Sequence, residues 1–192
     1  MRRMIFWITM LTVIDQAVKL LIAHFLMDAQ FTIIPGVLSF YVSQNIHLGW
    51  IWVRLNIMMP LHFAVIITIV QTLVVIIYIR FISYATHNYR KFQSIPGKSM
   101  MLILTGSVCK LIDDIFWGGS LDFLEIFDWF IFDIKDIYIT IGLLLLFVCI
   151  ISNQIWYYGK LTKKERQIEK LRWKFINWFK SGMTKAGVGH DR

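Results

Sequence analysis

The chain has 192 residues, a length that allows one compact unit and leaves little room for a second domain. Hydrophobic residues make up 57% and charged residues only 17%, a composition that excludes an ordinary soluble domain and indicates an integral membrane protein. The formal charge of +8 does not indicate a nucleic-acid partner, because the basic residues flank the apolar runs.

The first apolar run, about residues 4–26, follows two arginines and is longer than the hydrophobic region of a signal peptide. No small-x-small cleavage site follows it, so we predict a retained first membrane span. Asp15 and Lys19 lie one helical turn apart inside this run. They are either a neutralising i,i+4 pair that faces the bundle interior, or a structural tie between this span and a functional site.

Residues 28–56 are too irregular for a membrane span and contain β-branched and aromatic runs around a turn at Pro35-Gly36. They predict a small extramembrane β segment on the outer face of the membrane. His47 lies in this segment without a second ligand at a useful spacing, so we predict no metal site.

Three further apolar runs complete the predicted fold class, a membrane all-α bundle of four transmembrane helices with one small β segment. The predicted later spans are about 60–79, 99–117 and 137–158, within a membrane domain that covers residues 1–158. We expect a basic connecting loop at 80–98, and we expect Cys109 and Cys149 to be apolar packing residues rather than a disulfide.

The tail has a different character from the membrane domain. Residues 159–181 predict a basic amphipathic helix that lies on the anionic inner leaflet, or alternatively docks a partner helix. Residues 182–192 predict a disordered tail. An orientation with both termini in the cytoplasm puts sixteen of the twenty Lys and Arg residues on the cytoplasmic side, in agreement with the positive-inside rule.

Seven of the twelve acidic residues fall between 106 and 142. In the predicted topology Asp113 and Asp136 lie at a similar depth near the outer leaflet, on neighbouring helices. Two close carboxylates share a proton, so one can activate a water while the other donates to a carbonyl, as in aspartic peptide hydrolysis. The alternatives are pairing of these acids with Lys110 and Lys135, or a small proton or ion conductor.

The other acids of this stretch have a plainer interpretation. Asp122, Glu125 and Asp128 fall between the third and fourth predicted spans. We expect them on an outer loop, where solvation explains their charge.

Several short motifs recur in an order that is typical of one membrane peptidase family. Asp15-Gln16-Ala17-Val18-Lys19 fits an Asp-Gln-x-x-Lys element, and Pro35-Gly36 precedes an expected strand and a loop that contains Asn45. Asp113 fits the first Asp of Gly-Asn-x-x-Asp-Arg followed by Gly-x-Val-x-Asp-Phe, with Gly118, Asp122 and Phe123 at the matching offsets. Phe132, Asp136, Ile139 and Gly142 fit Phe-Asn-x-Ala-Asp-x-x-Ile-x-x-Gly. Over about residues 4–156 the chain resembles bacterial signal peptidase II, the lipoprotein signal peptidase.

This resemblance implies a multi-pass enzyme of the bacterial inner membrane, with its active site near the outer leaflet. It implies an aspartic endopeptidase without a cofactor that removes signal peptides from diacylglyceryl-modified prolipoproteins. The catalytic residues would be Asp113 and Asp136, and Asn45 would bind the substrate. The implied partners are that substrate and membrane lipids, and the implied state is a monomer.

Four positions depart from the family motifs: Lys110, Asp114, Asp133 and Lys135 stand where the family has Asn, Arg, Asn and Ala. Lys110 and Asp133 are therefore candidates for substrate binding. Lys110 either favours ionisation of both catalytic acids or pairs with Asp114 or Asp133. These departures also allow a catalytically weakened protein of the same fold that binds lipoproteins or lipid. We assign structural roles to five motif residues: Asp15, Lys19, Gly36, Asp122 and Gly142.

Overall fold

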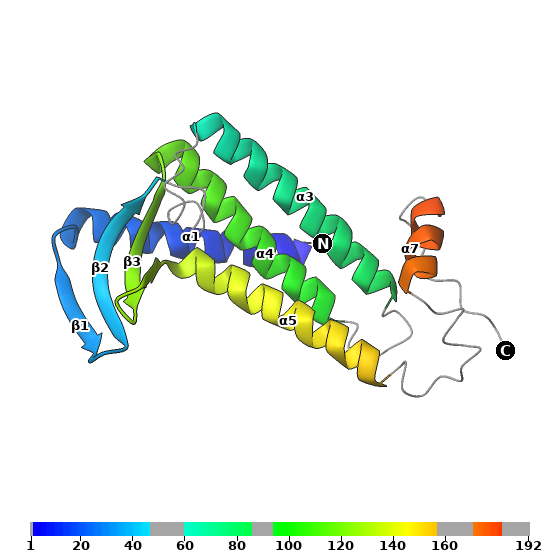
Figure 1. Ribbon diagram of the computed structural model, residues 1–192. Helices are drawn as coiled ribbons and strands as arrows, with labels where there is room; N and C mark the ends of the chain where they lie inside the picture. The colour runs from blue at the N-terminus through cyan, green and yellow to red at the C-terminus, as the bar shows by residue number, and fades with distance from the viewer. Residues whose placement is uncertain (1, 47–59, 86–93, 157–170, 182–192) are drawn as a thin grey trace. The chain divides into compact units, whose positions relative to one another are not determined.

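A computed structural model describes residues 2–46, 60–85, 94–156 and 171–181 of the chain (Figure 1). The chain divides into two compact units. The first unit consists of Met1–Thr72 and Leu102–Thr140, and the second of Leu73–Met101 and Ile141–Arg192. The predicted division into a membrane domain, a basic helix and a tail stays a prediction.

The first unit contains one antiparallel sheet with the strand order β1-β2-β3-β4. Strands β1 (Gln30–Ile34) and β2 (Leu38–Asn45) confirm the β structure expected within residues 28–56. Strands β3 (Ser120–Ile126) and β4 (Phe130–Phe132) come from the stretch that was expected to be an outer loop, so that expectation is wrong. Residues 47–59, including His47, lie outside the described part of the chain.

Two tight turns fix the register of this sheet. Gly36 adopts a φ of +70° in the turn between β1 and β2, a conformation that glycine reaches without a steric penalty. Phe127 and Asp128 both have positive φ in the turn between β3 and β4, and Trp129 N–H closes that turn on the carbonyl of Ile126 at 3.1 Å. Two successive positive φ values are the signature of a type I′ hairpin, whose twist matches the twist of the strands.

Helix α1 (Arg2–Phe25) packs its C-terminal half on the sheet. Ile22 of this helix, Phe40 of β2, and Leu121 and Phe123 of β3 form a buried apolar cluster. Each such side chain contributes roughly 1.5–3 kcal/mol by leaving water, so this small core attaches the sheet to the helix. The site described below lies beside this contact.

Helix α4 (Ser94–Ile112) continues without a break into the π-helix η2 (Asp113–Trp117). Gly118, with a φ of +68°, terminates η2 in the left-handed conformation, and Gly119 follows with a φ of +154°. A Cβ on Gly119 would lie 2.7 Å from the carbonyl oxygen of Asn45. The two glycines therefore let the chain turn at once from η2 into β3 beside β2.

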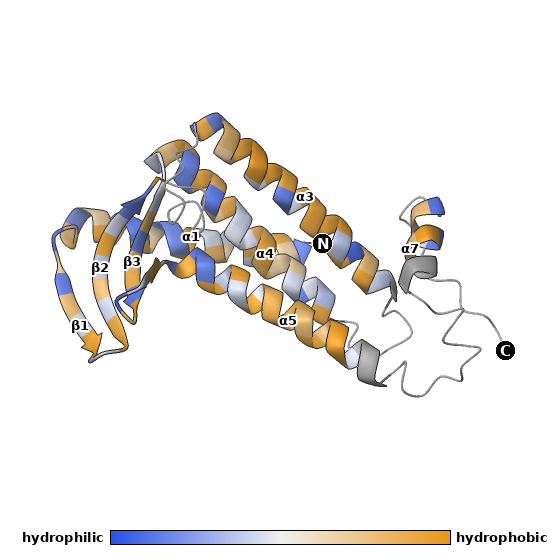
Figure 2. Ribbon diagram, viewed as in Figure 1, coloured by the Kyte–Doolittle hydropathy of each residue, from blue (hydrophilic) through white to orange (hydrophobic). Residues whose placement is uncertain are grey.

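Within the described residues, three helices are long and apolar enough to cross a membrane: α1 over Arg2–Phe25, α3 (Leu61–Ala85) over Leu61–Tyr84, and α5 (Ile134–Trp156) over Ile134–Ser152. Figure 2 shows the hydrophobic residues that run along α3 and α5. These helices confirm three of the four predicted spans, and α4 as a fourth span stays a prediction.

The basic loop predicted at 80–98 is largely wrong, because α3 extends to Ala85 and α4 begins at Ser94. Pro96 lies in the first turn of α4, where a missing N–H leaves no helical hydrogen bond unmade. This is why a Pro-Gly pair in the sequence does not mark a loop here.

In the second unit, α7 (Leu171–Lys180) confirms helical structure for the end of the predicted basic helix. Its Trp178 is buried and packs against Phe81, which also makes an edge-to-face contact with Phe175. Residues 159–170 and the tail predicted at 182–192 lie outside the described part. Cys109 and Cys149 are buried and are not joined in a disulfide, as expected from the sequence.

Candidate functional site: a buried cluster of acids around two lysines

Five carboxyl groups and two ammonium groups gather in the first unit, where α1, η2, β3 and the start of α5 contribute side chains. We call this group the acidic cluster, and it consists of Asp15, Lys19, Asp113, Asp122, Asp133, Lys135 and Asp136. All except Asp136 are buried. Because charges are costly to bury without partners, each member is best understood by what contacts it.

Lys19 links three elements. Its Nζ lies 3.0 Å from Asp15 Oδ2 on the same helix, and 2.6 Å from both Asp113 Oδ2 and Asp133 Oδ2. The sequence left two interpretations of the Asp15–Lys19 spacing, an internal pair or a tie to a site. Both kinds of contact are present. Lys19 neutralises the charge of Asp15 on its own helix, and it also connects α1 to Asp113 of η2 and to Asp133 before α5.

Asp113 is fully enclosed, with no exposed surface. Its Oδ1 accepts from Gln16 Nε2 at 3.1 Å, and its Oδ2 accepts from Ser120 Oγ at 3.0 Å and from Lys19. Lys135 Nζ lies 3.4 Å from the same Oδ2. Through these contacts the Asp113 carboxyl group ties η2 to α1, β3 and α5.

Lys135 lies at the centre of the cluster. Its Nζ is 2.6 Å from Asp133 Oδ2, 3.5 Å from Asp122 Oδ1 and 4.0 Å from Asp136 Oδ2, and it also donates to the Ser120 hydroxyl. One oxygen from each of these three aspartates lies within 4.8 Å of the others. Three carboxylates this close attract a cation, and here the Lys135 ammonium provides the positive charge.

Asp133 and Asp136 form a reciprocal cap at the start of α5. Asp133 Oδ1 accepts from the backbone N–H of Asp136 at 3.2 Å, and Asp136 Oδ2 accepts from the N–H of Asp133 at 3.3 Å. This is the capping-box arrangement, with aspartate in both positions. Burial raises the pKa of Asp133, but the ammonium groups of Lys135 and Lys19 outweigh it, so its pKa lies below the ordinary value.

Asp122 comes from β3 and accepts a hydrogen bond from Asn45 Nδ2 of β2 at 3.1 Å. The β2–β3 register pairs Asn45 with Ser120 and Ser43 with Asp122, which brings this amide to the carboxyl group. Burial raises the pKa of Asp122 above its ordinary value, despite the nearby Lys135. Asp122 therefore takes up a proton more readily than an ordinary aspartate does.

Exposure separates the acids of the cluster. The side chain of Asp136 is 35% exposed, while that of Asp113 is 0% exposed. A substrate can reach a carboxyl group only where solvent reaches it, so Asp136 is open to a substrate and Asp113 is enclosed. Asp122 is 4% exposed, and one of its carboxylate oxygens lies within 4.8 Å of a carboxylate oxygen of Asp136.

The remaining predicted site residues lie in different places. Lys110 pairs with Asp114 at 2.5 Å, which confirms one of its two predicted partners. Gly36 lies in the β1–β2 turn. Gly142 is in the second unit, where its carbonyl accepts from Ser99 Oγ at 2.7 Å. The part of the chain that the structure describes contains no ion pair between Lys110 and the acidic cluster.

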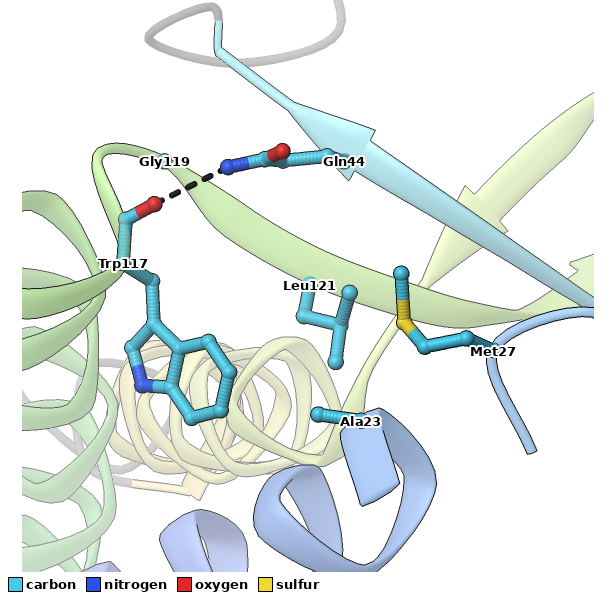
Figure 3. A pocket seen from close by; sticks show the side chains of 6 residues that line it. All are labelled: Ala23, Met27, Gln44, Trp117, Gly119 and Leu121. Atoms are coloured by element: carbon cyan, nitrogen blue, oxygen red, sulfur yellow. Dashed lines mark hydrogen bonds between the residues drawn. The ribbon is translucent and has the colours of Figure 1, made fainter. Parts of the chain in front are cut away.

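A pocket of about 160 Å³ opens beside the cluster (Figure 3). Gln44 Nε2 donates to the carbonyl of Trp117 at 2.9 Å, so two residues of the lining are joined by a hydrogen bond. Trp117 Nε1 in turn donates to Gln16 Oε1 at 3.2 Å, and Gln16 contacts Asp113. The pocket is lined by Ala23, Met27, Gln44, Trp117, Gly119 and Leu121. Its mainly apolar lining can accept a small apolar group, and two hydrogen bonds in series, through Trp117 and Gln16, connect it to Asp113.

The sequence predictions had not included two features of this site. Lys135 was considered only as a partner for nearby acids, although it contacts four of them. Asp122 was assigned a structural role and a place on an outer loop. Its position in the Gly-x-Val-x-Asp-Phe motif was the one available signal that it belongs to the site.

Comparison with known proteins adds independent observations. A sequence profile of the family described as Signal peptidase (SPase) II matches residues 7–152. A lipoprotein signal peptidase from Caldicellulosiruptor bescii is 28% identical over 153 residues, which cover 78% of this chain and 93% of that protein. One from Lactobacillus johnsonii is 29% identical over 140 residues, covering 71% of this chain and 84% of that protein.

Two solved structures have a similar fold. Both are bacterial membrane enzymes determined by the in meso method. The first has a TM-score of 0.62 at 22% identity and covers 85% of this chain and 96% of its own. The second has a TM-score of 0.59 at 24% identity and covers 78% and 93%. At this identity the likeness supports the arrangement of helices and sheet.

Proposed function

The chain belongs to the signal peptidase II family, and from that membership we propose how its acidic cluster acts. The protein is an aspartic peptidase that removes the signal peptide from lipoprotein precursors. We assign the reacting pair of carboxyl groups to Asp122 and Asp136. The sequence favoured Asp113 and Asp136, so the choice between Asp113 and Asp122 is the central point to test.

One observation carries this assignment. An oxygen of Asp122 and an oxygen of Asp136 lie within 4.8 Å of each other, at a place where Asp136 is 35% exposed. Two carboxyl groups this close share a proton, and a water or a peptide can approach from the exposed side. Asp113 lacks the exposed side, because it is fully enclosed, and its Oδ2 lies 2.6 Å from Lys19.

The shared proton permits hydrolysis without a covalent intermediate. The ionised carboxylate takes a proton from water as the water oxygen attacks the scissile carbonyl carbon, and the protonated carboxyl group gives its proton to the carbonyl oxygen. This produces a tetrahedral diol. The C–N bond then breaks, one hydroxyl proton returns to a carboxylate, and the leaving nitrogen receives a proton from the pair. The products are a new carboxyl group and a free amine.

The neighbouring residues support the pair in defined ways. Asn45 donates to Asp122 at 3.1 Å, so it orients that carboxyl group and remains a candidate for contact with the substrate. Asp133 caps α5 and fixes Asp136. The pocket beside Trp117 is suited to an apolar group of the substrate. Lys110 pairs with Asp114, which is not part of the acidic cluster, so a substrate bound by Lys110 would have to extend beyond the cluster.

The membrane arrangement is proposed on the same basis. Helix α4 would be a fourth span beside α1, α3 and α5, with both termini in the cytoplasm and the acidic cluster near the outer leaflet of the inner membrane. The distribution of Lys and Arg supports this orientation. The substrate would be a prolipoprotein that carries diacylglycerol and approaches the active site from the lipid phase. The enzyme would act as a monomer.

The test uses the full chain purified into lipid vesicles and a diacylglyceryl-modified prolipoprotein, with cleavage followed by a gel shift. We expect cleavage by the native chain and none by Asp136→Asn. The unmodified precursor serves as the matched substrate control and should not be cleaved. Cleavage that persists at the native rate in Asp136→Asn would refute the assignment. Binding of the modified precursor without cleavage by the native chain would instead favour the weakened, non-catalytic alternative.

A further inference from the structure

We propose that Lys135 is a positioning residue that sets how many protons the Asp122–Asp136 pair carries at neutral pH, an inference that rests on the proposed function. Among the described residues, Lys135 is the one cation with ion-pair contacts to both members of the pair. Its Nζ lies 3.5 Å from Asp122 and 4.0 Å from Asp136. In the family motif alanine stands at this position, so the cation is a feature of this chain.

The ammonium of Lys135 is held in place rather than free to swing into solvent. Its side chain is 4% exposed, it contacts Asp133 Oδ2 at 2.6 Å, and it donates to Ser120 Oγ. Asp133 is itself fixed as the N-terminal cap of α5. The charge therefore stays at a constant position beside the pair, which is the condition for a steady electrostatic effect.

The other charges around the pair act in a different place. Lys19 contacts Asp15, Asp113 and Asp133, and within the described residues its ion pairs do not extend to Asp122 or Asp136. Asp113 approaches Lys135 at 3.4 Å from η2 and shares its charge. Lys19 thus offsets the enclosed acids, whereas Lys135 is the cation, among the described residues, whose ion pairs join Asp113 and Asp133 to the reacting pair.

The direction of the effect follows from simple electrostatics. Two carboxyl groups within 4.8 Å of each other resist losing both protons, because two negative charges would then lie side by side. A nearby ammonium favours each ionised form, so the pair releases its protons at lower pH than it would without the ammonium. Lys135 therefore moves the pH range in which the pair holds one proton, the state that hydrolysis needs, toward acidic pH.

The experiment compares the pH dependence of kcat/KM for the native chain and three variants, on the modified precursor in vesicles. Lys135→Ala restores the family residue, and Lys135→Gln keeps a hydrogen-bond donor without the charge. We expect both limbs of the profile to move to higher pH by about one to three units in these two variants. Lys135→Arg should keep both limbs in place. Lys98→Ala, which removes an exposed lysine of α4, is the matched control and should also leave the limbs unmoved.

The outcomes separate this inference from the proposed function. If Lys135→Ala and Lys135→Gln still cleave the precursor and the limbs of their pH profiles do not move, the inference is overturned. The proposed peptidase function would still hold. If the uncharged variants fail to accumulate in membranes while Lys135→Arg accumulates normally, the charge serves folding and the inference also fails. A native chain that does not cleave at any pH would instead count against the proposed function.

Discussion

The acidic cluster has a closed side and an open side, and the two use the same residue types for opposite purposes. On the closed side, Asp113 is fully enclosed and accepts from Lys19, Gln16 and Ser120. On the open side, Asp136 is 35% exposed and meets Lys135 only at 4.0 Å. Saturated hydrogen bonding makes a carboxylate structural, whereas incomplete pairing beside solvent leaves it available for chemistry.

This contrast accounts for the position of Asp122. It is buried like Asp113, and its contacts are the Asn45 amide at 3.1 Å, the Ser120 side chain and the Lys135 ammonium at 3.5 Å. Burial without full compensation raises its pKa, as expected for a group that must hold a proton for part of a reaction. Asp122 therefore belongs with the open side.

The largest expected effect tests this division directly. Asp122→Asn should reduce kcat by about 10³-fold while the variant still folds, because a proton-transfer group is lost and the shape is kept. Asp113→Asn should instead reduce the amount of folded protein, because it leaves the Lys19 ammonium less compensated in a buried site. Cleavage rate and yield in membranes, measured for both variants, give the answer. A folded, inactive Asp113→Asn beside an active Asp122→Asn would restore the pair predicted from the sequence.

The next effect concerns the closed side alone. Lys19→Met should lower the free energy of unfolding by about 3–5 kcal/mol, since Asp15, Asp113 and Asp133 all lose a buried cation. Thermal unfolding in detergent measures this loss. Combining Lys19→Met with Asp113→Asn should cost less than the sum of the single variants, because the second change removes a charge left unpaired by the first. Strict additivity would show that the two residues do not act as one group.

A smaller effect tests how the backbone brings the two sides together. Gly119→Ala should cost about 1–3 kcal/mol, because its Cβ would lie 2.7 Å from the Asn45 carbonyl where φ is +154°. It should also lower activity by displacing the Asn45 amide from Asp122. Gly36→Ala is the matched control, since its φ of +70° is strained but no atom lies within 4 Å of the added carbon. Equal loss of activity in both variants would contradict this view of Gly119.

The sequence was sufficient for what depends on local pattern. Long apolar runs predicted three helices, and the Pro35-Gly36 turn marked the first hairpin. The third-span acids could be ranked only by depth along a helix. Depth does not reveal enclosure, and the enclosure of Asp113 comes from Lys19 and Gln16 of α1, nearly a hundred residues away.

The strands β3 and β4 could not be predicted for a related reason. In β3 the first four residues are all buried, so the alternation of buried and exposed positions that marks a half-buried strand is missing. Asp122 and Glu125 gave the segment the composition of a solvated loop. Asp122 is accommodated there by Asn45 and Lys135, and that compensation exists only after the chain has folded.

The smallest expected effect links the open side to stability. Because burial raises the pKa of Asp122, its ionised form is disfavoured in the folded state at neutral pH. Asp122→Asn should therefore raise the free energy of unfolding by about 1 kcal/mol at pH 7, a common result of removing a strained functional group. The gain should shrink as the pH falls toward the ordinary Asp value, because the native carboxyl group is then protonated and its penalty disappears. Melting temperatures of both proteins at pH 7 and pH 4 measure this difference. A variant that is less stable than the native chain at pH 7 would place Asp122 with Asp113 on the closed side, as a residue that holds the fold together.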